Sequence, residues 1–121
     1  MSGKDLVVSF LTTMEQRDLA KASALLAPGT IMTFPGNAKF KSLEEVVAWS
    51  KRRYKFIRKT YHYFDETERS GVITVYCLGM LNGEALDGSP IANVRFLDRF
   101  DIMGGKIVDQ EVWNDLAEFK K

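Results

Sequence analysis

The sequence contains a single cysteine and a single histidine among its 121 residues. Cys77 alone can form no intramolecular disulfide and no cysteine-built zinc site, which fits a reducing compartment, so we expect a cytoplasmic protein. His62 alone leaves none of the ligand spacings that are typical of metal sites. We therefore expect neither a metal nor another cofactor.

The sequence also lacks a large excess of charge of one sign and has no long apolar run. Seventeen Lys and Arg oppose sixteen Asp and Glu, and the net charge of +1 is too small to attract nucleic acid or an anionic membrane. No window approaches the roughly 18 apolar residues of a membrane span, and the apolar run near the N-terminus is too short for a signal peptide. We expect neither a nucleic-acid partner nor a membrane anchor.

The length suits one domain, residues 1–121, whose first half has mainly helical periodicity. We expect helices over residues 3–17, from residue 19 until Pro28-Gly29, and from residue 43 onward, with a short strand over residues 30–34 and a loop over residues 37–41. Ser2 with Asp5 and Ser42 with Glu45 resemble capping boxes. The apolar stripe of the third helix continues through Tyr54 to Ile57.

The second half is typical of β-structure. Four strands are expected over residues 59–68, 72–82, 91–103 and 106–115. Turns rich in Gly, Ser, Asn or Asp separate them, which predicts an antiparallel meander, and Gly79, Gly83 and Gly88 lie where a long strand would bend or turn. Because the helices precede the strands, the fold class is α+β, with helices covering one face of a curved sheet.

Asp98 is the lone charge on an otherwise apolar strand face. Alternation places it with Ala92, Val94, Phe96, Phe100 and Ile102. It can be a structural carboxylate that is ion-paired or hydrogen-bonded within the sheet. If it is buried and unpaired, it is protonated and donates a hydrogen bond to a ligand; as a carboxylate next to a ligand, it acts as a base.

Other candidate site residues lie on neighbouring elements. His62 titrates in a range that suits proton transfer, so we take it as a second catalytic candidate. Gln110 and Asn114 fall on the expected inner face of the last strand, with Val108 and Val112, and Gln110 is a possible hydrogen-bond partner of Asp98. Tyr54 is a candidate pocket residue, whereas Trp113 lies on the opposite face.

The segment 51–59 carries six basic residues in nine, with aromatic residues between them. We interpret it as the solvated face of a helix. The alternatives are an anion or nucleic-acid contact and salt bridges to a second subunit through Asp65, Glu66 or Glu68.

Three segments together resemble the nuclear-transport-factor-2-like (NTF2-like) superfamily, in particular its SnoaL-like polyketide cyclases and ketosteroid-isomerase-like members. They are the opening VVSFLTTMEQRDLAKASALLAPGTIMTF, the glycine-spaced GMLNGEALDGSPI and the terminal LDRFDIMGGKIVDQEVW. The resemblance implies a cone-shaped sheet that curls around the third helix and encloses an apolar pocket. It also implies a homodimer paired through the sheet.

The resemblance places Asp98 at the aspartate that ketosteroid isomerases hold in their oxyanion hole. Phe10 and Phe34 stand where those isomerases have a tyrosine and a general base, and Phe96 and Val112 stand where limonene-epoxide hydrolases have an arginine and a second aspartate. Asp98 is thus retained without its usual partners.

Three functional hypotheses follow. The first is a homodimeric enzyme, a cyclase or isomerase, that binds a small apolar carbonyl or polyketide-like molecule and uses Asp98 as acid, base or oxyanion donor, assisted by Gln110 and His62. The second is a non-catalytic ligand-binding or dimerisation domain, which the apolar residues at familiar catalytic positions favour. A module that recruits another protein is a third hypothesis, and it requires an exposed apolar patch.

Overall fold

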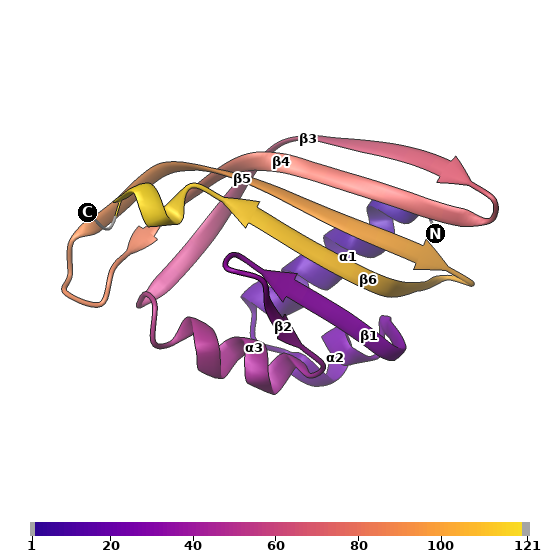
Figure 1. The fold of residues 1–121 in the computed structure, drawn as a ribbon, viewed down its shortest axis with the longest axis horizontal. Helices are drawn as coiled ribbons and strands as arrows, with labels where there is room; N and C mark the ends of the chain where they lie inside the picture. Colours follow the sequence, from indigo (N-terminus) through magenta and orange to yellow (C-terminus); the bar gives the residue numbers. More distant parts are fainter. Residues whose placement is uncertain (1, 120–121) are drawn as a thin grey trace.

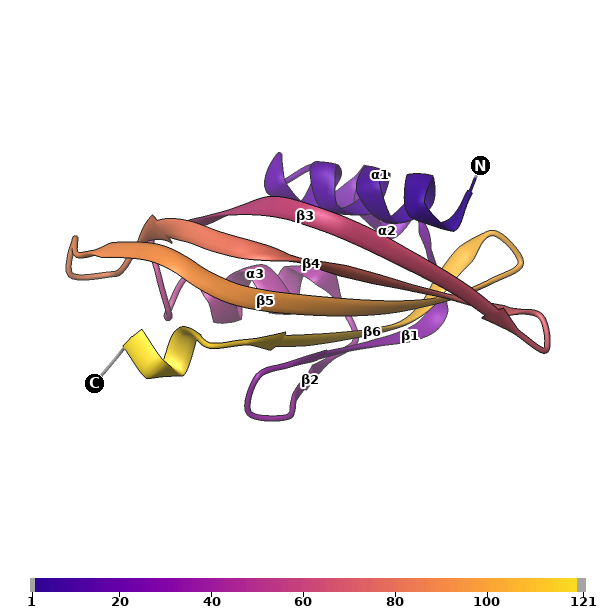
Figure 2. The ribbon, with the colours of Figure 1, turned by 90° about the horizontal axis from the view of Figure 1, so that it is seen from above.

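The computed structural model describes residues 2–119; residue 1 and residues 120–121 of the predicted domain lie outside the described part. The helices are α1 (Gly3–Glu15), α2 (Leu19–Ser23), α3 (Leu43–Ser50) and a 3-10 helix, η1 (Leu116–Phe119). The strands are β1 (Leu26–Phe34), β2 (Ala38–Phe40), β3 (Phe56–Arg69), β4 (Val72–Glu84), β5 (Pro90–Met103) and β6 (Lys106–Asn114). Figures 1 and 2 show one strongly curved sheet with α1, α2 and α3 against one of its faces, which confirms the predicted α+β class.

The sheet has the strand order β2-β1-β6-β5-β4-β3. The predicted antiparallel meander of β3 to β6 is confirmed. The sheet as a whole is mixed, because β1 runs parallel to β6, with Met32 opposite Gln110. The predicted loop over residues 37–41 is wrong: Gly36 and Asn37 adopt positive φ angles in a tight turn, so that β2 folds back on β1 as a hairpin.

The helix starts are confirmed and two helix ends are wrong. The backbone N–H groups of Asp5 and Glu45 donate hydrogen bonds to the Ser2 and Ser42 hydroxyls at 3.1 and 3.2 Å. The second helix ends at Ser23, so that Pro28-Gly29 lies within β1, at an irregularity in its pairing with β6. The third helix ends at Ser50, because the following run of aromatic and β-branched residues pairs with β4 as the start of β3.

The predicted alternation along β5 holds from Val94 to Ile102 and is wrong at Ala92, which is exposed while Ile91 is buried. Asn93 has a positive φ of 54°, and the pairing of β4 with β5 shifts register there, so the side chains before it change face. A similar shift between β5 and β6 buries Ile107 where Val108 was expected.

The core lies between α1 and the concave face of the sheet. Phe10 of α1 packs edge to face on Phe100 of β5, with ring centroids 5.9 Å apart. Gly79 and Gly83 lie where the backbone of β3 approaches β4 closely, since a Cβ at either position would collide with a β3 backbone oxygen. Absence of these side chains lets β3 curl toward the helices and close one side of the core.

The longest helix, α1, has 13 residues. Within residues 2–119, no helix combines the length and the hydrophobicity needed to cross a membrane.

Candidate functional site

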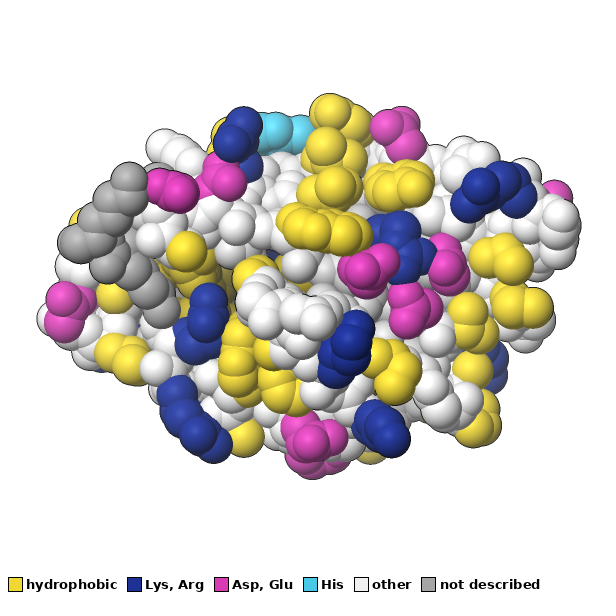
Figure 3. All heavy atoms as spheres, in the orientation of Figure 1, with side chains coloured by type: hydrophobic (Ala, Val, Ile, Leu, Met, Phe, Trp, Pro, Cys, Tyr) yellow, Lys and Arg dark blue, Asp and Glu magenta, His cyan; other side chains and the backbone are white. Residues whose placement is uncertain are grey.

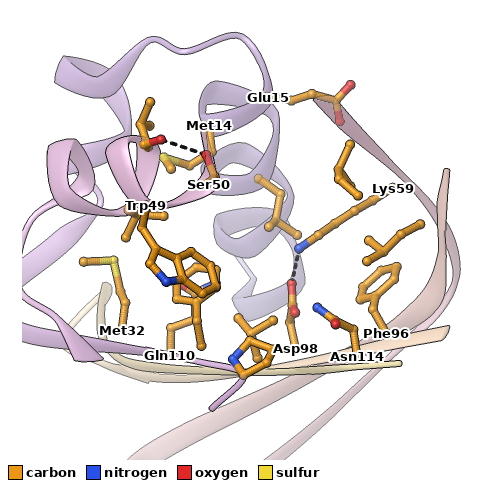
Figure 4. Close-up of a pocket in the computed structure, with 18 of the residues that line it drawn as sticks. Met14, Glu15, Met32, Trp49, Ser50, Lys59, Phe96, Asp98, Gln110 and Asn114 are labelled. Carbon is orange, nitrogen blue, oxygen red and sulfur yellow. Dashed lines mark hydrogen bonds and ion pairs between the residues drawn. The ribbon is translucent and has the colours of Figure 1, made fainter. Parts of the chain in front are cut away.

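A cavity of about 130 Å³ lies between α1, α3 and the concave face of the sheet. Its walls are mainly apolar and aromatic, and Figure 4 shows the sheet as its floor and the helices on the opposite side. The eight predicted site residues that line it are Phe10, Phe34, Tyr54, Phe96, Asp98, Gln110, Val112 and Asn114. These residues come from four elements, α1, β1, β5 and β6, and from the connection between α3 and β3, and their roles in binding stay predictions.

Asp98 is paired with a lysine rather than isolated. The Nζ of Lys59, from β3, donates a hydrogen bond to Oδ2 of Asp98. The Asp98 side chain is 0% exposed and that of Lys59 is 22% exposed, so a molecule in the cavity meets the lysine first (Figure 4). Asp98 is the only charged residue on its face of β5, and the alternative of an ion-paired carboxylate matches the geometry.

The second oxygen of the same carboxylate is buried without a partner. Oδ1 of Asp98 forms no hydrogen bond with any residue of the described part of the chain, so the pairing expected with Gln110 is not formed. Gln110 and Asn114 lie on either side of Asp98 on the cavity floor, and Oδ1 of Asn114 accepts a hydrogen bond from the Leu116 backbone N–H at 3.0 Å. A buried acceptor without a donor is rare and destabilising.

On the sheet side of the cavity, the charges are those of this ion pair. Burial lowers the pKa of Lys59, but the negative charge of Asp98 and the hydrogen bond to it raise that pKa by more, so the net shift is upward and the lysine stays charged. Burial raises the pKa of Tyr61 to about 12 and, together with the charge of Asp98, raises that of the Cys77 thiol to about 12. Both groups are therefore neutral near pH 7, and the thiol is a poor nucleophile.

Lys59 was missed because segment 51–59 was interpreted as a solvated helix face. That interpretation is wrong, since the helix ends at Ser50 and the last residues of the segment begin β3. The signal that could have identified Lys59 was the two-residue alternation of a strand. Ile57, Lys59 and Tyr61 alternate with more exposed neighbours, and all three line the cavity.

Aromatic packing forms the opposite wall, and no pattern in the sequence pointed specifically to its centre, Trp49. The Trp49 ring lies 5.2 Å from that of Phe34 and 5.4 Å from that of Phe40, and the guanidinium of Arg53 lies 4.4 Å from it. Met14, Glu15 and Ser50 lie beyond Trp49 on the helix side of the cavity (Figure 4). Charged residues of both signs, Glu15, Arg17 and Arg53, thus contribute to the lining.

His62 is not brought to the cavity. A bulge in the pairing of β3 with β4 lies between Tyr61 and Tyr63, and His62 is the unpaired residue within it. Its side chain is exposed and does not line the cavity. Because strand alternation breaks at a bulge, the expected placement of this histidine fails.

Within residues 2–119, no group of three or more His, Cys, Asp or Glu is arranged to hold a metal ion. On the sheet side of the cavity, the polar groups include the Lys59 ammonium and the amides of Gln110 and Asn114, and the unpartnered oxygen of Asp98 lies buried beneath the ammonium. This set can donate hydrogen bonds to an oxygen and accept one proton, within a largely apolar enclosure.

No family model and no curated protein matches the chain. Among solved structures, an NTF2-like protein of unknown function from Burkholderia pseudomallei is 24% identical, with a TM-score of 0.77 over 98% of this chain and 95% of that one. TerC, co-crystallised with polyporic acid, is 15% identical, with a TM-score of 0.76 over 96% and 93%. Aln2 from Streptomyces is 10% identical, with a TM-score of 0.69 over 97% and 91%.

These likenesses extend over almost the whole of each chain, so the NTF2-like fold predicted from the sequence is confirmed. The curved, unclosed sheet of six strands and the helices on its concave face are the shared features.

Proposed function

Because the chain has the NTF2-like fold, we propose that its cavity binds a small apolar carbonyl compound and catalyses proton transfer next to the carbonyl group, as an isomerase or cyclase does. The observation that carries this proposal is the Lys59–Asp98 ion pair in an apolar cavity. A buried ion pair contributes little to stability compared with apolar residues of the same volume, because both charges must be desolvated. Its presence in a cavity therefore favours a chemical role.

Each member of the pair has a distinct role. The Lys59 ammonium donates a hydrogen bond to the carbonyl oxygen, where negative charge builds as the adjacent carbon loses a proton. Oδ1 of Asp98, which lacks a partner, accepts that proton, and the electron pair of the broken C–H bond forms the enolate. Since Asp98 lies beneath Lys59, the lysine moves toward the substrate oxygen as the carboxylate becomes accessible. Return of the proton to another carbon completes an isomerisation.

Asp98→Asn should abolish most of this activity, because the amide keeps the size of the side chain and cannot act as a base. We expect exchange of the protons next to the carbonyl, followed by NMR in D₂O over a panel of cyclic ketones, to slow by roughly 10²- to 10⁴-fold. Asp101→Asn is the matched control, since Asp101 lies on the same strand but is paired with Arg99, 2.6 Å away, outside the cavity. Equal exchange in folded Asp98→Asn and wild-type protein would refute the proposal.

A non-catalytic binding domain is the second candidate. The residues at familiar catalytic positions are packed as wall: Phe34 against Trp49, and Phe96 against Tyr61 with ring centroids 5.9 Å apart. TerC, which shares the fold, was crystallised with a small organic molecule. Ketones that bind to the wild-type protein without any proton exchange would favour this candidate.

A homodimer through the convex face of the sheet is part of the same proposal. Tyr63, Leu78, Leu97 and Trp113 are neighbours in register across β3, β4, β5 and β6 and form an apolar row, called here the outer row. Its ends are the most open part, with Tyr63 54% and Trp113 48% exposed. Figure 3 shows apolar side chains crossing this face above a basic residue surrounded by acidic ones, and Arg99 pairs here with Asp101, Asp109 and Glu111. An open apolar row of this kind is typical of a subunit interface.

Trp113→Arg should therefore weaken dimerisation by at least about thirtyfold, the effect of losing an aromatic anchor residue of the interface. Sedimentation velocity over a concentration series measures the change. Leu86→Arg is the control, because Leu86 is an equally exposed apolar residue outside the outer row. A wild-type protein that stays monomeric at high concentration would contradict the dimer.

A further inference from the structure

The size and the charge balance of the cavity define its ligand more narrowly. We infer that the cavity takes a neutral carbonyl compound with a single six-membered ring, whose oxygen accepts a hydrogen bond from Lys59. This inference rests on the proposed function and specifies its substrate class.

The volume limits the ligand to one ring. The cavity measures about 130 Å³, and an engineered apolar cavity of about 150 Å³ in another protein holds benzene. The aromatic walls are fixed by their own contacts, because Trp49 packs on Phe34 and Phe40, and Phe96 packs on Tyr61. On the sides that these rings form, space for a second fused ring would require the ring contacts to break.

The charge balance excludes ionised ligands. On the sheet side of the cavity, the positive charge of Lys59 is already matched by Asp98, so an anion bound beside this pair would find no unpaired positive charge there; the other charged lining residues, Glu15, Arg17 and Arg53, lie on the helix side. A cation would meet the lysine, which lies over the entry to Asp98 and 4.9 Å from the centre of the Phe96 ring. A neutral ligand avoids both costs.

The hydrogen-bonding capacity of Lys59 favours a ligand that carries an acceptor oxygen. An ammonium group has three N–H donors, and within the described residues only Asp98 accepts a hydrogen bond from Lys59. A carbonyl oxygen on the ring uses a second donor while the ring itself contacts aromatic walls. A ring of the same shape without an oxygen leaves that donor unused.

The test compares four probes: cyclohexanone, methylenecyclohexane (the same shape without the oxygen), benzoate, and the fused-ring ketone α-tetralone. In a Trp113→Phe background, Trp49 is the only tryptophan, and its place in the cavity wall makes its fluorescence a binding signal. We expect cyclohexanone to bind more tightly than benzoate and α-tetralone. Tighter binding of benzoate would overturn the neutral class, and tighter binding of α-tetralone would overturn the single ring.

A double variant, Lys59→Met with Asp98→Leu, tests the hydrogen bond without leaving an unpaired buried charge. We expect the affinity for cyclohexanone, relative to methylenecyclohexane, to fall roughly tenfold to a hundredfold, as for a lost hydrogen bond to a charged group. Lys55→Met is the matched control, because Lys55 pairs with Glu84 outside the cavity. An unchanged preference in the double variant, or no binding of cyclohexanone to the unsubstituted cavity, would overturn the inference.

These outcomes are separable from those of the proposed function. Cyclohexanone that binds through the pair but exchanges no protons would refute the catalytic proposal and leave the ligand class intact. Proton exchange confined to α-tetralone and larger ketones would support catalysis and refute the single-ring class.

Discussion

Lys59→Met is expected to lower the free energy of unfolding by about 3–5 kcal/mol, which is the typical cost of leaving one member of a buried ion pair without its partner. Asp98 has no exposed surface and its Oδ1 lacks a hydrogen-bond partner, so loss of Lys59 removes the only hydrogen bond to the side-chain oxygens that the described structure shows. Methionine keeps most of the volume of the lysine side chain. The decrease in the free energy of unfolding therefore reflects the unpaired charge of Asp98 rather than lost packing. Urea unfolding followed by circular dichroism gives the free energy.

Two further variants identify the cause. The double variant Lys59→Met with Asp98→Leu is expected to recover the wild-type stability to within about 1 kcal/mol or to exceed it, because apolar side chains replace both charges. Lys55→Met breaks the exposed pair with Glu84, whose atoms are 2.9 Å apart, and should cost less than about 1 kcal/mol. If Lys59→Met costs no more than Lys55→Met, the Lys59–Asp98 pair does not have the buried character described above.

A stable double variant without ligand preference or activity would separate folding from function. The fold then requires only volume at these two positions, and the charges serve the ligand. Conversely, a double variant that is as unstable as Lys59→Met would show that the fold itself requires the ion pair that joins β3 to β5.

Local patterns were sufficient for much of the fold and for most of the cavity. The hydroxyls of Ser2 and Ser42 mark the helix starts because capping depends on residues within one turn. Alternation along β5 identified the buried face that carries Phe96, Asp98 and Phe100, because side-chain direction in a strand depends on position alone.

Features that depend on distant contacts were not predictable in this way. The partner of Asp98 lies 39 residues away, and its sequence neighbours include five other basic residues, so charge alone did not single it out. The parallel pairing of β1 with β6 joins the two ends of the chain, and local periodicity carries no information about strand neighbours. The bulge beside His62 and the positive φ of Asn93 each shift the alternation by one residue, which moves side chains to the other face.

The curvature that brings Lys59 over Asp98 leads to the second prediction: Gly79→Ala should lower the free energy of unfolding by about 3 kcal/mol, at the upper end of the usual cost of overpacking. A Cβ at this position would collide with the backbone oxygen of Thr60 and lie 3.0 Å from the ring of Phe96. The backbone of β3 cannot yield by a rotamer change, so β3 must move away from β4. Urea unfolding measures the loss.

Gly71→Ala provides the control, since Gly71 lies in the turn between β3 and β4 with a positive φ of 83° and open space around it. Its cost is only the backbone strain of an L-residue in that region, roughly 1–2 kcal/mol. Any larger decrease in the free energy of unfolding for Gly79→Ala therefore reports the close approach of β3 and β4. Because Lys59 precedes Thr60 on β3, the folded fraction of Gly79→Ala should also bind cyclohexanone more weakly, whereas that of Gly71→Ala should not. Equal stability and equal binding in the two variants would show that the close approach of β3 to β4 at Gly79 does not position Lys59.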